Sequence, residues 1–369
     1  MTTSTATPAG PTPAGAYTRA EIMSQPRSWQ AAIDAVARHQ IALQAIFQRN
    51  ADRPVLFVGC GSPYYLNLSA AATFRELTGR WALAAPASEV LYNIPNVLPG
   101  AAAPLVIAVS RSGETSELVA ACKLLKEQRG CPVVAITVTE HTTLSRISDE
   151  TVYIPDAAEQ SVAQTRSFAA MLVATLAAVA LAAGRPDLIA ELQTVAGQGD
   201  AYLQRIDAPI AQLIGHGYDR MFFLGSGLRH GLAHEGSLKM KEMSLSNSEP
   251  FHFMEFRHGP QSMIDAGTLV VGLVSQQASA AETRVLSEMA AMGGAVIAIQ
   301  PDQVPTGALR YSTVQLPAGY SEVAGLVYYM PVLHLLAYHQ AMRKGLNCDS
   351  PRNLHAWIRL EDLAASGSL

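Results

Sequence analysis

Three hydroxyl side chains lie close together in one short stretch, at Ser110, Ser112 and Thr115, around Gly113. The apolar run over residues 105–109 before them is typical of a buried strand, and the residues after them are typical of a helix. A turn between a parallel strand and a helix presents unpaired backbone N–H groups and the positive end of the helix dipole. We therefore expect this turn to bind an anion such as phosphate, with the hydroxyl groups as further donors.

Ser62 occupies a similar place after the apolar run over residues 54–58, so it would join the same site if the two strands are neighbours. These residues also have a structural alternative. Ser112 or Thr115 could cap the helix that follows, with Glu114 favouring its dipole. Capping is the better interpretation of an isolated Ser-Gly-Glu-Thr stretch, but the neighbouring strand and turn favour the anion site.

A second group of reactive side chains is formed by Glu235, Lys239 and Glu242, which recur at helical spacing on roughly one side of a predicted helix. From the charges alone, a solvated face of ion pairs is the more ordinary explanation. His258 follows sixteen positions after Glu242. A histidine can change its charge near neutral pH, although a lone histidine is more often structural.

The elements that must position these residues alternate between strand and helix. After a helical region over residues 17–48, apolar runs end in small-residue turns and lead into helices, which predicts parallel sheets. The same plan returns roughly 165 positions later, as expected for an internal duplication. The repeated sequences are FVGCG (57–61) with FLGSG (223–227), and GCPVVAI (130–136) with GGAVIAI (293–299).

The duplication predicts an α/β protein with two tandem three-layer αβα domains, each with a parallel, flavodoxin-like sheet. The first domain, with its N-terminal helices, is expected over 17–190 and the second over 208–348. The polar, Gly- and Pro-containing segment near 183–207 is expected to contain the boundary between them. We expect a disordered leader over 1–16 and a C-terminal tail over 349–369.

Composition favours a small-molecule partner. A formal net charge of -4 and a pI near 6.2 indicate no general attraction to nucleic acid or to acidic membranes. The four cysteines are scattered, without zinc-site spacing, and the N-terminus does not resemble a secretory signal, so we expect a cytoplasmic protein without a metal. The apolar segment 171–183 is too short to cross a bilayer and is expected to form a buried helix.

Two stretches resemble a known family. SRSGET (110–115) resembles the signature loop of sugar isomerase (SIS) domains, and EQSVAQTRSF (159–168) resembles the substrate-side segment after it. EGSLKMKE (235–242), followed by His258-Gly259-Pro260, is similar to the catalytic element in the isomerase half of glucosamine-6-phosphate synthase. The resemblance extends over roughly residues 50–355. Neither glycine turn carries the GxGxxG fingerprint, which argues against a nicotinamide enzyme.

The resemblance implies a role for each residue of the site. Ser62, Ser110, Arg111, Ser112 and Thr115 would hold the phosphate of a sugar or amino-sugar phosphate.

On the sugar side, the resemblance implies that Val162 and Gln164 line the ring and that Lys239 lies near its hydroxyl groups. Glu242 would be the base that moves a proton between C1 and C2. His258 would assist ring opening from the adjacent subunit of a homodimer. No cofactor is implied, since acid–base groups suffice for this chemistry.

Two positions depart from the family pattern. The tail DSPRNL (349–354) resembles that of the synthase, which crosses the active site and carries a lysine just afterwards, but the matching position here is Ala356, beside His355. A Schiff base with a tail lysine is therefore not expected. Pro63 stands where the family usually has a second hydroxyl beside Ser62.

The expected activity is aldose–ketose isomerisation, deamination of an amino-sugar phosphate or deglycation of a fructosamine phosphate, and the sequence leaves all three open. No glutaminase domain is expected, because no amidotransferase segment precedes this sequence. The alternative is a non-catalytic phosphosugar sensor, which would not need Glu242 and His258 together. A homodimer is further expected because apolar stretches such as 326–336 need cover.

Overall fold

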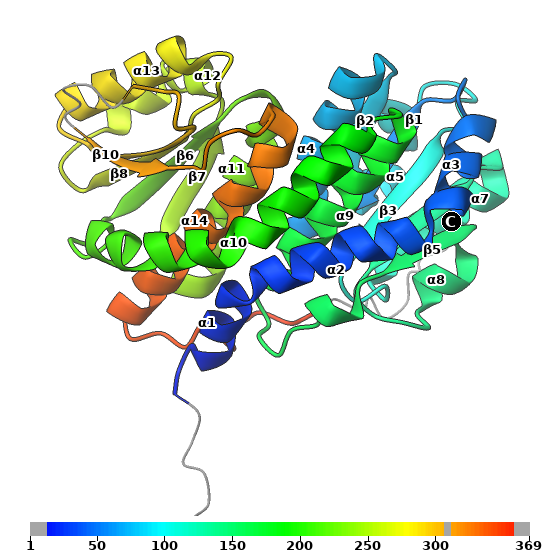
Figure 1. The fold of residues 1–369 in the computed structure, drawn as a ribbon, viewed down its shortest axis with the longest axis horizontal. Coiled ribbons are helices and arrows are strands. Elements are labelled where there is room, and N and C mark those ends of the chain that lie inside the picture. The colour runs from blue at the N-terminus through cyan, green and yellow to red at the C-terminus, as the bar shows by residue number, and fades with distance from the viewer. Residues whose placement is uncertain (1–12, 306–310, 358–369) are drawn as a thin grey trace, which may run out of the picture.

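The computed structural model describes residues 13–305 and 311–357. Two parallel five-stranded sheets, each flanked by helices, confirm the predicted duplication and fold class (Figure 1). The first sheet has the order β2-β1-β3-β4-β5, and the second has the order β7-β6-β8-β9-β10 when read from the matching edge. The strands are β1 (Val55–Gly59), β2 (Ala82–Pro86), β3 (Leu105–Ser110), β4 (Val133–Thr137), β5 (Glu150–Tyr153), β6 (Arg220–Gly225), β7 (Asn247–Phe251), β8 (Thr268–Leu273), β9 (Ala295–Gln300) and β10 (Ser312–Gln315).

Helices cover both faces of each sheet. The α-helices are α1 (Ala16–Met23), α2 (Gln25–Arg38), α3 (Gln40–Arg49), α4 (Ser62–Thr78), α5 (Ala87–Tyr92), α6 (Ile94–Val97), α7 (Ser116–Arg129), α8 (Thr143–Ile147), α9 (Arg166–Ala182), α10 (Pro186–Leu213), α11 (His230–Ser244), α12 (Phe253–Phe256), α13 (Ser279–Ala291) and α14 (Glu322–Arg343). The short 3₁₀ helices among the described residues are η1 (Pro155–Ala157), η2 (Gly227–Arg229) and η3 (Pro260–Met263). The leader expected over 1–16 lies mostly outside the described residues, and Ala16 already begins α1.

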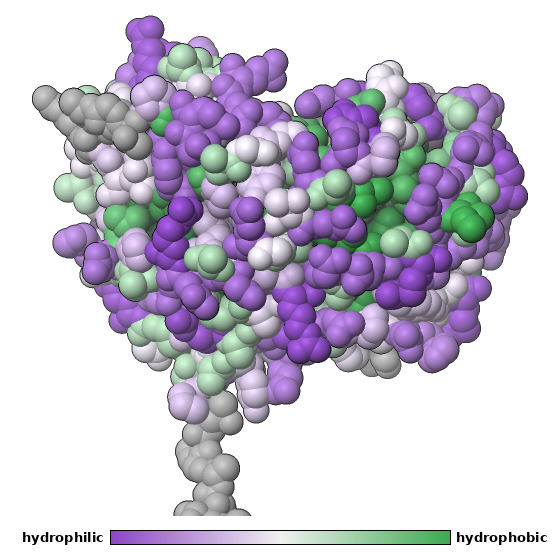
Figure 2. All heavy atoms as spheres, in the orientation of Figure 1, coloured by the Kyte–Doolittle hydropathy of each residue, from purple (hydrophilic) through white to green (hydrophobic). Residues whose placement is uncertain are grey.

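The central strands β1, β3 and β4 are buried along their whole length, as expected for parallel strands covered on both faces. Their side chains alternate between two cores. Val55 and Phe57 face a large core that includes α9, α10 and α14, whereas Leu56 and Val58 face α5 and α7. The large core joins the two sheets, and much of the outer face seen in Figure 2 carries hydrophilic residues.

The helices bear on three of the expectations. The segment 186–213, which includes most of the expected boundary, is a single helix, α10. Gly199 lets it approach α2, because a Cβ there would lie 2.6 Å from atoms of Pro26 and Trp29. Residues 326–336 lie in α14 and are buried within this chain, so they need no cover from a partner. The segment 171–183 lies in and just after α9 and is largely buried, as predicted.

No helix within residues 13–305 and 311–357 is long and apolar enough to cross a membrane. The two sheets fall within the ranges expected for the two domains, since β1–β5 end before residue 190 and β6–β10 begin after residue 208. The domain limits themselves stay a prediction.

Candidate functional site

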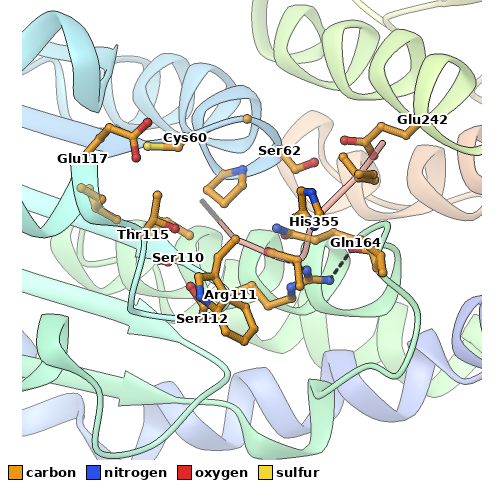
Figure 3. Close-up of a pocket in the computed structure, with 18 of the residues that line it drawn as sticks. Cys60, Ser62, Ser110, Arg111, Ser112, Thr115, Glu117, Gln164, Glu242 and His355 are labelled. Carbon is orange, nitrogen blue, oxygen red and sulfur yellow. Dashed lines mark hydrogen bonds between the residues drawn. The ribbon is translucent and has the colours of Figure 1, made fainter. Parts of the chain in front are cut away.

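A cavity of about 180 Å³ opens where the first domain faces α11 of the second (Figure 3). It lies at the carboxyl ends of β1 and β3, where ligands bind in open parallel sheets. Nine of the ten site residues expected from the sequence line it. They are Ser62, Ser110, Arg111, Ser112, Thr115, Val162, Gln164, Lys239 and Glu242.

The hydroxyl-rich turn after β3 is held in shape by its own side chains. The Gly113 N–H donates to Ser110 Oγ at 3.0 Å, and the Glu114 N–H donates to Ser112 Oγ at 3.2 Å. Gly113 has a φ of +63° and packs against Thr142, so a Cβ at Gly113 would lie 2.4 Å from Thr142 Oγ1. Glycine is therefore required here both for its backbone conformation and for space.

The capping alternative does not describe this turn. Thr115 is the N-cap residue of α7, but its side chain makes no capping hydrogen bond. The Glu114 carboxylate is directed to the next loop, where it accepts hydrogen bonds from Thr143 N at 2.7 Å and Thr143 Oγ1 at 2.8 Å. The start of α7 therefore faces the cavity without a side-chain cap of its own.

A second helix, α4, also begins at the cavity. Its N-cap residue Gly61 has a φ of +60° and no side chain, and Ser62 begins the helix. Pro63 lies in the first turn, where a backbone N–H would have no partner within the helix, so the departure from the family pattern costs the helix no hydrogen bond. Two helix N-termini and their hydroxyl groups thus surround one end of the cavity.

Arg111 joins three parts of the chain. Its guanidinium donates to the carbonyl oxygens of Val162 at 2.9 Å and Ala356 at 3.0 Å, and it lies 3.5 Å from the Glu159 carboxylate. The side chain lines the cavity, and these three contacts are made by Nη1 and Nη2. Its expected role as a phosphate ligand stays a prediction.

The C-terminal tail crosses the cavity over the residues that the structure describes. It is anchored by Asp349, whose carboxylate accepts hydrogen bonds from Thr18 N and Thr18 Oγ1, both at 2.8 Å. Val162 N also donates to the Asp349 carbonyl oxygen at 2.9 Å. Residues 354–357 then line the cavity, with His355 among them, while residues 358–369 lie outside the description.

The charged residues of α11 form a buried cluster, so the expected alternative of a solvated ion-pair face is wrong. The exposed fractions of the Glu235, Lys239 and Glu242 side chains are 0%, 1% and 17%. Lys239 Nζ lies 3.4 Å from Glu235 Oε1 and contacts Glu242 directly. Lys239 and Glu242 line the cavity, whereas Glu235 lies behind them.

Burial changes the proton affinities of this cluster. It raises the pKa of Glu235 to about 7, although Lys239 and the Ser62 hydroxyl act in the opposite direction. For Lys239, burial disfavours the charge, but the neighbouring Glu235 and Glu242 carboxylates outweigh it and raise the pKa of the ammonium. The cavity therefore has a lysine held in its charged form beside the carboxylate of Glu242.

A model of the SIS domain family matches residues 49–181 and 216–318. The chain belongs to the SIS domain family.

The relatives of this SIS protein include longer proteins. It is 30% identical over 351 residues to the isomerizing glutamine–fructose-6-phosphate aminotransferase of Pyrococcus horikoshii, covering 92% of this chain and 57% of that protein. The corresponding enzyme of Methanosarcina acetivorans is 32% identical over 321 residues, covering 83% of this chain and 51% of the relative. The chain thus spans about half the length of the curated relatives it matches.

Solved structures share the fold over nearly the whole chain. Glucosamine-6-phosphate deaminase of Thermotoga maritima is 25% identical with a TM-score of 0.76, covering 94% of this chain and 100% of that one. Tagatose-6-phosphate ketose/aldose isomerase of Escherichia coli is 24% identical with a TM-score of 0.84, covering 96% and 99%. The second likeness concerns the fold alone.

His258 is the expected site residue that this SIS protein does not bring to the cavity. It is exposed in the turn after α12 and is absent from the cavity lining. Among the described residues, His355 is the histidine that lines the cavity, and Figure 3 shows it between Ser62 and Gln164. The role of His258 stays a prediction that requires a second subunit.

Two polar residues of the cavity were missed from the sequence. Cys60 and Glu117 lie together at its inner end, and burial together with Glu117 raises the pKa of the Cys60 thiol to about 12. Glu117 could have been found from its place in the first turn of the helix after the SRSGET stretch. Over residues 13–305 and 311–357, no group of three or more histidine, cysteine or carboxylate side chains is placed to hold a metal ion.

Proposed function

We propose that this protein is an enzyme that moves a proton between C1 and C2 of a sugar or amino-sugar 6-phosphate. The observation that carries this proposal is that one cavity has the hydroxyl-rich helix N-termini at one end and the Lys239–Glu242 pair at the other. A phosphate monoester needs the first feature and an acid–base reaction needs the second. Such a substrate agrees with the names of relatives, among them a glutamine–fructose-6-phosphate aminotransferase and a glucosamine-6-phosphate deaminase.

In the proposed reaction, the phosphate binds at Ser110, Ser112, Thr115 and Ser62, and this places C1 and C2 near α11. The Glu242 carboxylate removes the proton from one carbon, which leaves an enediol or enolamine, and it returns the proton to the other carbon. Lys239 compensates the charge of this carboxylate and reaches the sugar hydroxyl groups. Isomerisation, deamination and deglycation share this step. Isomerisation is complete after it, whereas in deamination and deglycation water then hydrolyses the sugar imine and the amine leaves.

The tail argues for proton transfer rather than covalent capture. Ala356 occupies the place of the family's lysine, and His355 lines the cavity instead. A neutral imidazole can accept or donate a proton at a sugar oxygen, but it does not form a Schiff base with the open-chain sugar as an amine does. We therefore propose a reaction without an imine to the protein.

The carboxylate assignment is tested by the Glu242→Gln variant, which keeps the size of the side chain and removes its basicity. We expect turnover to fall by roughly 10²–10⁴-fold, the usual contribution of a general base. Binding of a hexose or hexosamine 6-phosphate, measured by thermal shift with unphosphorylated sugars as controls, should change little. Full activity in the variant would refute the role of Glu242, and binding without any turnover in the wild type would favour a sensor.

A homodimer with shared active sites is part of the proposal, because His258 is exposed and does not line the cavity of its own chain. Mixing the inactive variants Glu242→Gln and His258→Ala should restore part of the activity if each supplies the residue that the other lacks. If His258→Ala alone remains fully active, the imidazole of the reaction is His355. The free thiols of Cys60, Cys122 and Cys131 lead us to propose a reducing, cytoplasmic location.

A further inference from the structure

A second cavity, of about 140 Å³, occupies the equivalent place in the second domain. The matching sheet orders make β6 the counterpart of β1 and β8 the counterpart of β3. The second cavity lies at the turns that follow these two strands, as the first cavity does in its own domain. Its lining includes Ser226, Gly227, Arg229, Ser275, Gln277 and Glu322.

The turn after β8 repeats the hydrogen bonding of the turn after β3. Ser275 Oγ accepts from Ala278 N at 2.9 Å, and Ser110 Oγ accepts from Gly113 N at 3.0 Å. The two turns therefore share this hydrogen bond and a place in the sheet, although their backbones differ, since φ is +63° at Gly113 and -110° at Ala278. In the second turn, however, Gln277 replaces the hydroxyl of Ser112, and Ala278 replaces Gly113.

The second turn already binds an anionic group of the same chain. Glu322, the first residue of α14, accepts hydrogen bonds at Oε1 from Gln276 N at 2.5 Å and from Gln277 N at 3.0 Å. Its other carboxylate oxygen contacts the guanidinium of Arg229. Arg229 is only 4% exposed, and its Nε donates to the Tyr329 hydroxyl at 2.9 Å. Two converging backbone N–H groups and a buried guanidinium are typical donors to a bound phosphate.

We propose that the turn after β8 is a second anion site, which the Glu322 carboxylate occupies as an internal substitute for a phosphate group. Two further carboxylates face the cavity. Glu282 is buried and accepts from Ser275 N at 2.6 Å, and Glu76 approaches from α4. With Glu322 in place, Arg229 is neutralised and the remaining charge repels a second anion. The protein therefore has one phosphate site per chain although it has two homologous turns.

The test is the Glu322→Gln variant, with inorganic phosphate as the probe and ³¹P NMR titration as the measurement of bound phosphate per chain. The side chain keeps its length and one acceptor oxygen but no longer carries a charge, so a free anion can compete with it for Arg229 and the two N–H groups. We expect the variant to bind one more phosphate per chain than the wild type. An unchanged number of phosphates would overturn the proposal.

Two control variants separate this effect from a general change of charge. Glu288→Gln removes a carboxylate that pairs with Arg257 and Arg284 on the surface, and it should add no phosphate site. The double variant Arg229→Met, Glu322→Gln removes both charges of the second cavity and should lose the added site. An added site that persists in the double variant would also overturn the proposal.

The outcome is independent of the proposed function. If the wild type binds no phosphate and Glu322→Gln binds one, the phosphate site proposed for the first domain is refuted, whereas the anion site proposed for the second domain is supported. Glu322→Gln leaves a buried arginine without its partner and could fail to fold. In that case phosphate in the refolding buffer should restore the folded state, and the double variant should fold without phosphate. Absence of rescue by phosphate would count against the proposal.

Discussion

Replacing Gly113 by alanine should distort the hydroxyl-rich turn after β3, and the loss of stability has two separate causes. The first is the backbone, because φ is +63° and a non-glycine residue in this left-handed region costs about 1–2 kcal/mol. The second is space, because the new Cβ would lie 2.4 Å from Thr142 Oγ1 and 2.6 Å from Thr142 Cβ. Forcing an extra methyl group into packed structure costs about 1–3 kcal/mol.

The chain offers a matched control in Gly130. It has a φ of +60° at the end of α7, but nothing lies within 4 Å of the Cβ that an alanine would add. Gly130→Ala should therefore lower the free energy of unfolding only by the backbone contribution. Gly113→Ala should lower it by about 1–3 kcal/mol more. At about 2–4 °C per kcal/mol, this corresponds to a melting temperature roughly 2–12 °C below that of Gly130→Ala.

The two variants should also differ in substrate binding. Relief of the clash requires Thr142 to move, and Thr142 caps α8 through a hydrogen bond of 3.2 Å from Ser145 N to its Oγ1. The turn with Ser110 and Ser112 then shifts with it, so KM for a sugar 6-phosphate should rise in Gly113→Ala and stay unchanged in Gly130→Ala. Equal melting temperatures and equal KM values for the two variants would refute this reasoning.

Three further changes test other parts of the site. The pKa of Glu235 is about 7 in the folded protein, against an ordinary value of 4.5, so the folded state binds this proton more tightly than the unfolded state does. The contribution of Glu235 to the free energy of unfolding is therefore lost as the pH rises from about 4.5 through 7. Glu235→Gln should flatten the melting temperature over this pH range, and an unchanged slope would exclude Glu235 as its source. Thr115→Ala removes a hydroxyl from the proposed phosphate site. A hydrogen bond to a charged group contributes about 1.5–3 kcal/mol, so KM for a sugar phosphate should rise roughly 10- to 150-fold, while the affinity for unphosphorylated sugar should stay as it was. Asp349→Ala releases the tail from Thr18 and should raise KM more than it lowers kcat; a change in melting temperature alone would show that the anchor serves only stability.

The fold and most of the site could be predicted because local features determine them. Apolar runs that end in glycine turns mark parallel strands, and the carboxyl ends of neighbouring strands meet at one edge of the sheet. This is why Ser62 and Ser110 come together although 48 positions separate them. The family resemblance supplied Val162, Gln164, Lys239 and Glu242, for which no local pattern was decisive.

The features that could not be predicted are contacts between distant segments. The charges of Lys239 and its two glutamates are typical of a surface, and they are buried only because α4 and α14 pack around α11. The segment around Gly199 contains the usual signals of a loop, but its glycine allows a close helix contact with Trp29. Arg111 was expected to bind phosphate, and its hydrogen bonds to Val162 and Ala356 depend on where the tail crosses. None of these contacts follows from local spacing.

The divergence of the two copies explains why the site needs both domains. The first copy keeps hydroxyl groups at its anion turn, whereas the second has Leu228 in the place of Ser62 and fills its turn with Glu322. Conversely, α11 of the second copy carries Lys239 and Glu242, while its counterpart α4 has Asn67 and small or apolar residues over much of its buried face. Because α4 and α11 pack against each other, Lys239 and Glu242 of one copy reach the hydroxyl-rich turn of the other. Neither domain alone holds both halves of the proposed chemistry, so separating the domains should abolish turnover even if each one folds.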